Sequence, residues 1–425
     1  MNRDQFPALV DRFLRYVKID TQSDEKSEER PSTAKQHDML DLLIEELEAL
    51  GLADVEKTDY AAVMATLPAN LPPDHPAPDK VPTIGFIAHV DTYHATPGGG
   101  VEPRLHEDYQ GGDLVQNEEK GLVIKAEENE GLRKLIGDDI ITSDGTTLLG
   151  ADDKAGVAEI MDALTTIVCD PSIRHGGVRV AFTVDEEIGR GADGFDLEHF
   201  GAKCAYTMDG SVLGEVEDET FCADTATITV SGYDVHPGYG KGKLVNAVRV
   251  AADIIGRFHT DKLPETTEKK QGYLHPYELV GDVSKATVSI LVRDFEEEGL
   301  KTLEGILQDI CDETQKEFPK AKIEMEIKEF YRNMKYVLDQ HPMVMEVARR
   351  AIRELGIEPI TKPIRGGTDG SRLTLMGMPT PNIFAGGENF HSVKEYVSIQ
   401  TMEKAVQVIL GISKLWADAA AEGKV

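Results

Sequence analysis

Residues 178–187, with the sequence VRVAFTVDEE, carry the strongest indication of the fold. Up to residue 184 every second residue is a large apolar one, which is the pattern of a β-strand, and three acidic residues follow directly. Residues 155–167 have the apolar periodicity of a helix, and compact apolar strands are expected at 83–88 and 202–207. Strands that alternate with helices predict βαβ units, and therefore an α/β domain with a mostly parallel sheet and helices on both faces.

The same alternation continues toward both ends of the chain. Amphipathic helices are expected over 5–17, over 35–50, where Gly51 stops the helix, and over 401–419. The Pro-rich residues 71–82 are expected to form a surface loop.

Between about 217 and 335 the pattern changes to strand, helix, two strands, helix and strand. These elements are expected at 224–231, 243–258, 276–282, 286–293, 297–317 and 322–330, with a hairpin turn at 281–284. This order is that of a ferredoxin-like α+β unit. We therefore predict a main domain, 1–216 and 336–425, interrupted by an inserted domain, 217–335.

Length and charge exclude several classes of protein. The chain has 425 residues, which favours two domains, and a net charge of −31. Such an acidic surface repels nucleic acid and anionic membranes, because both bind clustered cations. The sequence shows neither a secretion signal nor the roughly 20 uninterrupted apolar residues of a membrane span. The four cysteines lack CxxC spacing and are expected to be reduced thiols, so a cytoplasmic location is expected.

Histidine and acidic residues follow the predicted strands at five places. They are His89 with Asp91, Asp152 with Asp153 at the start of a helix, Glu186 with Glu187, Asp209, and His391. Each alone has a structural explanation: a hydrogen-bonded pair, a helix N-cap or a solvated acidic turn. Because the carboxyl ends of parallel strands meet at one edge of the sheet, their recurrence there favours a metal site, and imidazole with carboxylate suits zinc.

Eight segments, taken together, resemble the M20 metallopeptidases, and among them the aminopeptidases that act on tripeptides. They are IGFIAHVDT (84–92), TLLGADDKAG (147–156), VRVAFTVDEE (178–187), YTMDG (206–210), VHPGYGKG (235–242), VRDF (292–295), RGGTDGSR (365–372) and GGENFH (386–391). They span nearly the whole chain in the order of the family, and this combination is far more specific than any single motif.

The resemblance implies a set of metal ligands. One zinc would be held by His89, Asp152 and Asp209, and the other by Asp152, Glu187 and His391. Asp152 is taken as the shared ligand because it stands two residues before Lys154, as the bridging acid does in the family.

The resemblance also implies roles around the metals. Asp91 would orient His89, and Glu186 would be the general base. The inserted domain would supply His236 to stabilise the oxyanion and Arg293 to bind the terminal carboxylate of the peptide. Asn246 and Arg365 would be further substrate contacts.

We therefore expect an aminopeptidase for short peptides with free termini, chiefly tripeptides, that uses two Zn²⁺ ions per subunit, for which Co²⁺ or Mn²⁺ could substitute. The inserted domain is expected to be a mobile lid that also pairs subunits in a homodimer. Two alternatives remain open: another M20-type hydrolase, such as a dipeptidase or an N-acyl amino acid deacylase, and a non-catalytic metal-binding or scaffold protein on the same fold.

Overall fold

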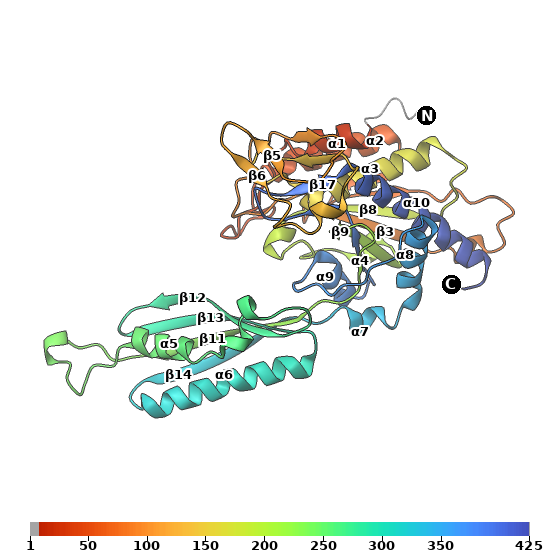
Figure 1. Cartoon of the computed structure of the whole chain (residues 1–425). Coiled ribbons are helices and arrows are strands. Elements are labelled where there is room, and N and C mark those ends of the chain that lie inside the picture. The colour runs from red at the N-terminus through yellow and green to blue at the C-terminus, as the bar shows by residue number, and fades with distance from the viewer. Residues whose placement is uncertain (1–7, 425) are drawn as a thin grey trace. The chain divides into compact units, whose positions relative to one another are not determined.

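The structure is a computed structural model that describes residues 8–424 (Figure 1). It divides into two compact units. Unit 1 comprises the described parts of Met1–Asp218, Tyr336–Lys362 and Thr368–Val425, and unit 2 comprises Glu219–Lys335 and Pro363–Gly367. Unit 2 is thus inserted in the sequence of unit 1 and receives a second, short segment from further along the chain.

Unit 1 is built on a seven-stranded sheet with the order β1-β2-β8-β3-β9-β15-β10. These strands are β1 (Ala53–Lys57), β2 (Val63–Leu67), β3 (Ile84–His89), β8 (Val178–Thr183), β9 (Cys204–Gly210), β10 (Val216–Glu217) and β15 (Asn382–Phe384). The four central strands β8, β3, β9 and β15 are parallel, as the βα alternation predicts. Strands β1, β2 and β10 are antiparallel additions at the two edges.

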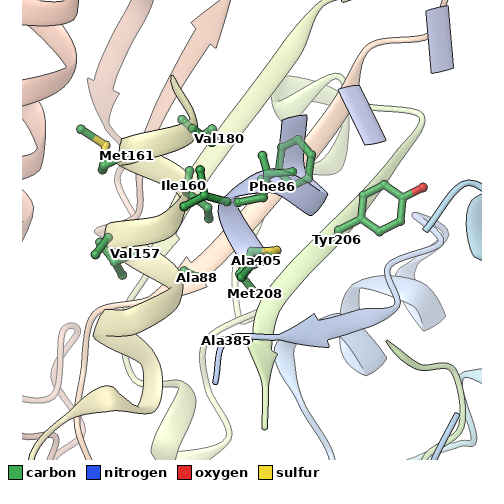
Figure 2. Packing of buried hydrophobic residues seen from close by; sticks show 14 of the residues in the cluster. Phe86, Ala88, Val157, Ile160, Met161, Val180, Tyr206, Met208, Ala385 and Ala405 are labelled. Atoms are coloured by element: carbon green, nitrogen blue, oxygen red, sulfur yellow. The ribbon is translucent and has the colours of Figure 1, made fainter. Parts of the chain in front are cut away.

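Alternate residues of the central strands pack on opposite faces of this sheet. Phe86 and Val180 join the large core on one face, and Ile87 and Ala181 join a smaller cluster on the other. Figure 2 shows Phe86 and Val180 beside Ile160 of helix α3 (Ala151–Cys169). Because side chains alternate with a period of two along a strand, both faces are apolar and helices cover both. The predicted α/β class is confirmed.

The helices of unit 1 fall into two groups by the core that they join. The large core contains residues of α1 (Leu9–Tyr16), α2 (Gln36–Leu50), α3, α8 (Pro342–Glu354) and α10 (Ile399–Ala421), and the smaller cluster contains residues of α4 (Leu197–Phe200) and α9 (Asp369–Met376). Gly51 ends α2 in the left-handed conformation, as predicted. Residues 5–7 of the predicted first helix lie outside the described residues.

A second sheet of unit 1 was not predicted. It has the order β16-β17-β7-β4, and a separate hairpin pairs β5 with β6. These strands are β4 (Arg104–His106), β5 (Leu114–Asn117), β6 (Leu122–Ile124), β7 (Ile140–Thr142), β16 (Gly387–Glu388) and β17 (Tyr396–Ser398). Strands of two to four residues are too short to show a period in the sequence. This sheet matters for the site, because β16 and β17 flank the loop that carries His391.

Unit 2 has the predicted order of elements. They are β11 (Cys222–Ser231), α5 (Ala247–Gly256), β12 (Tyr273–Gly281), β13 (Lys285–Asp294), α6 (Glu297–Glu317) and β14 (Lys322–Tyr331), and α7 (Lys335–Leu338) follows. The antiparallel sheet order β12-β13-β11-β14 is that of a ferredoxin-like unit. The predicted hairpin is the turn between β12 and β13, where the Asp282 carboxylate accepts the N–H groups of Ser284 and Lys285.

Two further expectations concern the chain as a whole. The four cysteines, Cys169, Cys204, Cys222 and Cys311, are free thiols. Within residues 8–424, no helix combines the length and the apolar content that a membrane crossing needs.

Candidate active site

Five segments of unit 1 meet at the carboxyl ends of its parallel strands. Strand β3 ends at His89, and β9 ends with Asp209 and Gly210. Glu186 and Glu187 form a short turn after β8, Asp152 opens helix α3, and His391 lies in the loop between β16 and β17. The parallel arrangement explains the meeting, because it brings successive strand ends to the same edge.

Asp152 lies between two histidines. Its Oδ1 is 3.0 Å from Nε2 of His89, and its Oδ2 is 3.2 Å from Nε2 of His391. Nε2 of His391 is also 2.8 Å from Oε2 of Glu187, and Nε2 of His89 is 3.7 Å from Oδ1 of Asp209. The result is two imidazole–carboxylate groups that have one carboxylate in common.

The neighbouring carboxylate of Asp153 faces the backbone. Ligand atoms of His89, Asp153 and Asp209 also lie within 4.8 Å of one another. However, Oδ2 of Asp153 accepts the backbone N–H of His89, and its Oδ1 accepts that of Gly156. Both oxygens of Asp153 are therefore engaged by backbone N–H groups, whereas those of Asp152 face the ring nitrogens of the two histidines.

Asp91 is fully buried and contacts both His89 and the two glutamates. Nδ1 of His89 is 3.0 Å from the carbonyl oxygen of Asp91 and 3.4 Å from its Oδ1. The same carboxylate accepts the backbone N–H groups of Glu186 and Glu187 at 3.0 and 3.2 Å. The carbonyl oxygen and the carboxylate of Asp91 thus both face Nδ1 of His89, which leaves Nε2 facing the cluster, and the carboxylate also fixes the backbone of both glutamates.

Burial of so many acidic groups shifts their proton affinities. Burial raises the pKa of Glu187 to about 8, and it raises the pKa of Glu186 well above its usual range. Burial acts in the same direction on Asp152, but hydrogen bonds from His391 and His89 outweigh it and hold the pKa of Asp152 below its usual value. Burial thus favours the protonated forms of the two glutamates, and a cation bound at the cluster would favour their ionised forms instead.

The donors present fit metal ions of the zinc type. Imidazole nitrogen and carboxylate oxygen are both zinc ligands, and the ligand atoms of Asp152, Glu187 and His391 lie within 4.8 Å of one another. Among the described residues, Oε1 of Glu187 is buried and has no hydrogen-bond partner. A buried carboxylate oxygen needs such a partner, and a metal ion would supply it.

The turn at 93–96 contacts His391 and holds it in place. This contact was not expected from the sequence. The ring of Tyr93 stacks on the imidazole of His391, with 4.0 Å between ring centroids and 4° between planes. The hydroxyl of Thr96 donates to the carbonyl oxygen of His391 at 2.6 Å. The side-chain amide of Gln22 contacts the carbonyl oxygens of residues 93, 94 and 96. The only signal in the sequence is that Tyr93 directly follows the HVDT segment.

The predicted oxyanion residue His236 is exposed in unit 2, and the predicted substrate contact Asn246 is half-buried there. His236 precedes a short turn, and its Nδ1 accepts the N–H of Gly238 at 3.2 Å. Its ring lies 5.4 Å from that of Tyr239. Asn246 caps helix α5, because its side chain accepts the N–H of Arg249. Both roles toward a substrate stay predictions.

The two predicted arginines make contacts within unit 2. Arg293 is only 7% exposed, and its Nη1 donates to the carbonyl oxygens of Asp224 and Val292. Arg365 lies over the rings of Phe221 and Tyr273 and donates to three oxygens in the segment 267–271. These contacts give Arg365 a structural role within unit 2, and its contact with substrate stays a prediction.

The chain matches known proteins over nearly its whole length. Residues 143–414 match the family described as Peptidase family M20/M25/M40. Peptidase T of Geobacillus thermodenitrificans (strain NG80-2) is 46% identical over 409 residues, which cover 96% of this chain and 98% of the relative. Peptidase T of Fusobacterium nucleatum subsp. nucleatum is 43% identical over 418 residues, which cover 98% of this chain and 100% of the relative.

Solved structures are similar over the same length. The crystal structure of aminopeptidase PepT from Bacillus cereus ATCC 10987 aligns with a TM-score of 0.72 at 25% identity, covering 98% of this chain and 99% of the other. A dinuclear metal-binding peptidase of the M20 family from Bacillus subtilis aligns with a TM-score of 0.62 at 13% identity, covering 96% and 98%. At that identity the likeness concerns the fold alone.

Proposed function

The chain belongs to peptidase family M20/M25/M40, and within it to the peptidase T group, and we propose that it removes the N-terminal residue from short peptides, chiefly tripeptides, by a two-zinc mechanism. The observation that carries the proposal is the position of the Asp152 carboxylate between Nε2 of His89 and Nε2 of His391. The names of the relatives, peptidase T and aminopeptidase PepT, support the reaction and the end of the peptide that is cut.

Two metal sites would share Asp152. His89 and Asp209 would complete one, and Glu187 and His391 would complete the other. A zinc pair bound there would lower the pKa of a shared water and polarise the carbonyl group of the substrate. Asp91 would keep Nε2 of His89 aimed at its site, because it holds the other ring nitrogen.

Glu186 would move the proton. It would take a proton from the attacking water and return it to the departing amine. Its Oε2 is 4.0 Å from Nε2 of His89, so the carboxylate borders the cluster, while its backbone N–H is held by Asp91. Burial raises its pKa, which makes its carboxylate a stronger base.

Unit 2 would recognise the substrate. His236 would donate to the oxyanion that forms at the scissile carbonyl. Arg293 would bind the terminal carboxylate, since a planar guanidinium can pair with it through two hydrogen bonds. Asn246, at the start of α5, would add a polar contact. Binding both ends of the peptide would set a length limit and favour tripeptides.

A peptide panel, combined with metal analysis, tests this proposal. We expect a free tripeptide to be hydrolysed well, and its N-acetylated and C-amidated forms to lose roughly tenfold or more in kcat/KM, because each loses a charge-assisted contact. Faster hydrolysis of dipeptides or of N-acetyl amino acids than of tripeptides would instead support a dipeptidase or a deacylase.

Substitution of Arg293 tests the carboxylate contact separately. In Arg293→Ala, the preference for the free acid over the amide should shrink, because the cation that distinguishes the two is gone. Arg257→Ala is the matched control, since Arg257 is an arginine of the same unit whose guanidinium pairs with Asp253 and Glu317. Thermal melting of both variants would reveal any loss of stability.

A further inference from the structure

Glu395 is a buried carboxylate in the loop that also carries His391. It is 1% exposed and stands just before β17. Its Oε2 accepts the backbone N–H groups of Leu149 and Gly150, both at 2.8 Å, and its Oε1 accepts that of Asp152 at 2.9 Å. All three donors belong to the turn that leads into helix α3, far away in the sequence.

This turn needs an acceptor from outside itself. The first N–H groups of a helix have no partner within the helix, and a buried N–H without a partner destabilises the fold. Gly150 has a φ of 83°, and Asp152 has a φ of −84° and a ψ of 102°, so neither residue is helical. None of the cap residues of α3 supplies a side-chain acceptor, because Gly150 occupies the N-cap position. Glu395 supplies the acceptor instead.

We propose that Glu395 is a positioning residue for the shared ligand Asp152. By holding the N–H of Asp152, it fixes the backbone from which the shared carboxylate projects. Because Glu395 lies four residues after His391 in one loop, the same contact ties the loop of one ligand to the turn of another. This inference rests on the proposed two-metal site.

The geometry also explains why a carboxylate is needed. Oε2 of Glu395 accepts two of the N–H groups, and Oε1 accepts the third. A glutamine of the same shape would present one oxygen and one NH₂ group, and an NH₂ group cannot accept an N–H. In either orientation of the amide, at least one donor of the turn would face another donor.

Zinc binding by the full-length protein tests the proposal. The metal-free wild type, Glu395→Gln and Glu395→Asp would each be titrated with Zn²⁺ in competition with a coloured chelator. We expect the wild type to bind two equivalents, and Glu395→Gln to bind both more weakly by roughly 10–100-fold, as for other groups that support metal ligands. Glu395→Asp keeps the charge but is one methylene shorter, so a smaller loss is expected.

A stability control separates positioning from general damage. Val347→Ala removes buried volume from α8 in the core of unit 1 and should lower the melting temperature without weakening Zn²⁺ binding. Equal weakening in Val347→Ala and Glu395→Gln would overturn the proposal, as would wild-type affinity in both Glu395 variants. Failure of both Glu395 variants to fold would assign Glu395 to folding and would also overturn it. Fewer than two equivalents in the wild type would count against the two-metal site itself.

Discussion

Glu186 and Glu187 are adjacent residues whose carboxylates have different surroundings. Oε2 of Glu187 is 2.8 Å from His391, whereas Oε2 of Glu186 approaches the cluster only at 4.0 Å from His89. We therefore expect Glu186→Ala to keep both metals and to lose roughly 10²–10⁴-fold in kcat, which is the usual contribution of a general base. Elemental analysis and steady-state kinetics on one tripeptide would measure the two effects.

Glu187→Ala is the matched control, because it should lose metal from one group. A Glu186→Ala enzyme that holds two metals and keeps a rate near that of the wild type would show that another group moves the proton. Loss of metal from Glu186→Ala would instead make Glu186 a ligand.

Asp152 and Asp209 should differ in the number of metals that depend on them. The carboxylate of Asp152 faces both His89 and His391, whereas that of Asp209 lies near His89. We expect Asp152→Ala to lower metal occupancy at both sites and Asp209→Ala to lower metal occupancy mainly at one site. The number of metal ions per chain, determined after dialysis, would measure both effects. Equal losses of a single metal from both variants would show that Asp152 is not shared.

At this scale the sequence indicated the candidate ligands, which the structure brings together, but not the residues that contact them. His89 and Asp209 lie at the carboxyl ends of β3 and β9, and the two glutamates follow β8 in a short turn, so the position of parallel strand ends makes their meeting predictable. Tyr93 and Glu395 lie in loops, where no periodicity relates a residue to its neighbour in space. The stacking of Tyr93 on His391 and the capping of the start of α3 by Glu395 depend on the path of the loops in space. Only the folded structure shows that path.

Among the structural elements, the 93–96 turn allows a test that concerns one metal site alone. Tyr93 stacks on His391, whose side chain is 44% exposed and which we propose as a ligand of only one site, the second site, formed by Asp152, Glu187 and His391. We expect Tyr93→Leu to weaken the second Zn²⁺ by roughly tenfold, because the ring that holds the imidazole plane is lost, while the first Zn²⁺ binds as before. Stepwise Zn²⁺ titration of the metal-free protein would separate the two.

Tyr93→Phe is the matched control, since it keeps the ring and removes only the hydroxyl. It should bind both metals like the wild type. Equal weakening of the two metals in Tyr93→Leu, or unchanged binding in that variant, would show that the stack does not position His391.

Elements with a clear period were predicted, and short ones were not. The alternation in 178–184 and the helical periodicity of 155–167 predicted β8 and α3, and the six elements of unit 2 were found in order. The antiparallel edge strands β1 and β2 and the small sheet that carries His391 were missed. They lack the periodic pattern because their strands are short or only partly buried on one face.

For the whole molecule, the eight segments predicted membership of the M20 family, and the relatives at 43–46% identity over nearly the full chain confirm it. The change of pattern near 217 and 335 indicated an inserted unit. It could not indicate that Pro363–Gly367 also belongs to unit 2, because that contribution depends on contacts such as those of Arg365 with Phe221 and Tyr273.

The division into units leads to a prediction about His236. Every proposed metal ligand lies in unit 1, whereas His236 is an exposed residue of unit 2. We predict that His236 reaches a substrate bound at the metals either from its own chain or from a second subunit of the predicted homodimer. In both cases His236→Ala should lower kcat on tripeptides by roughly 10²–10³-fold, as for the loss of an oxyanion donor.

Mixing inactive chains distinguishes the two routes. His236→Ala and Glu186→Ala chains would be combined, allowed to exchange subunits and assayed on a tripeptide, with each variant alone as the control. If His236 acts on the neighbouring subunit, a mixed dimer contains one complete site, and up to about a quarter of wild-type activity should return, because half of the chains pair in mixed dimers and each has one working site. If His236 acts within its own chain, every site in the mixture lacks one of the two residues and the activity stays at the level of the controls. Full kcat in His236→Ala alone would contradict both routes and would limit unit 2 to substrate binding.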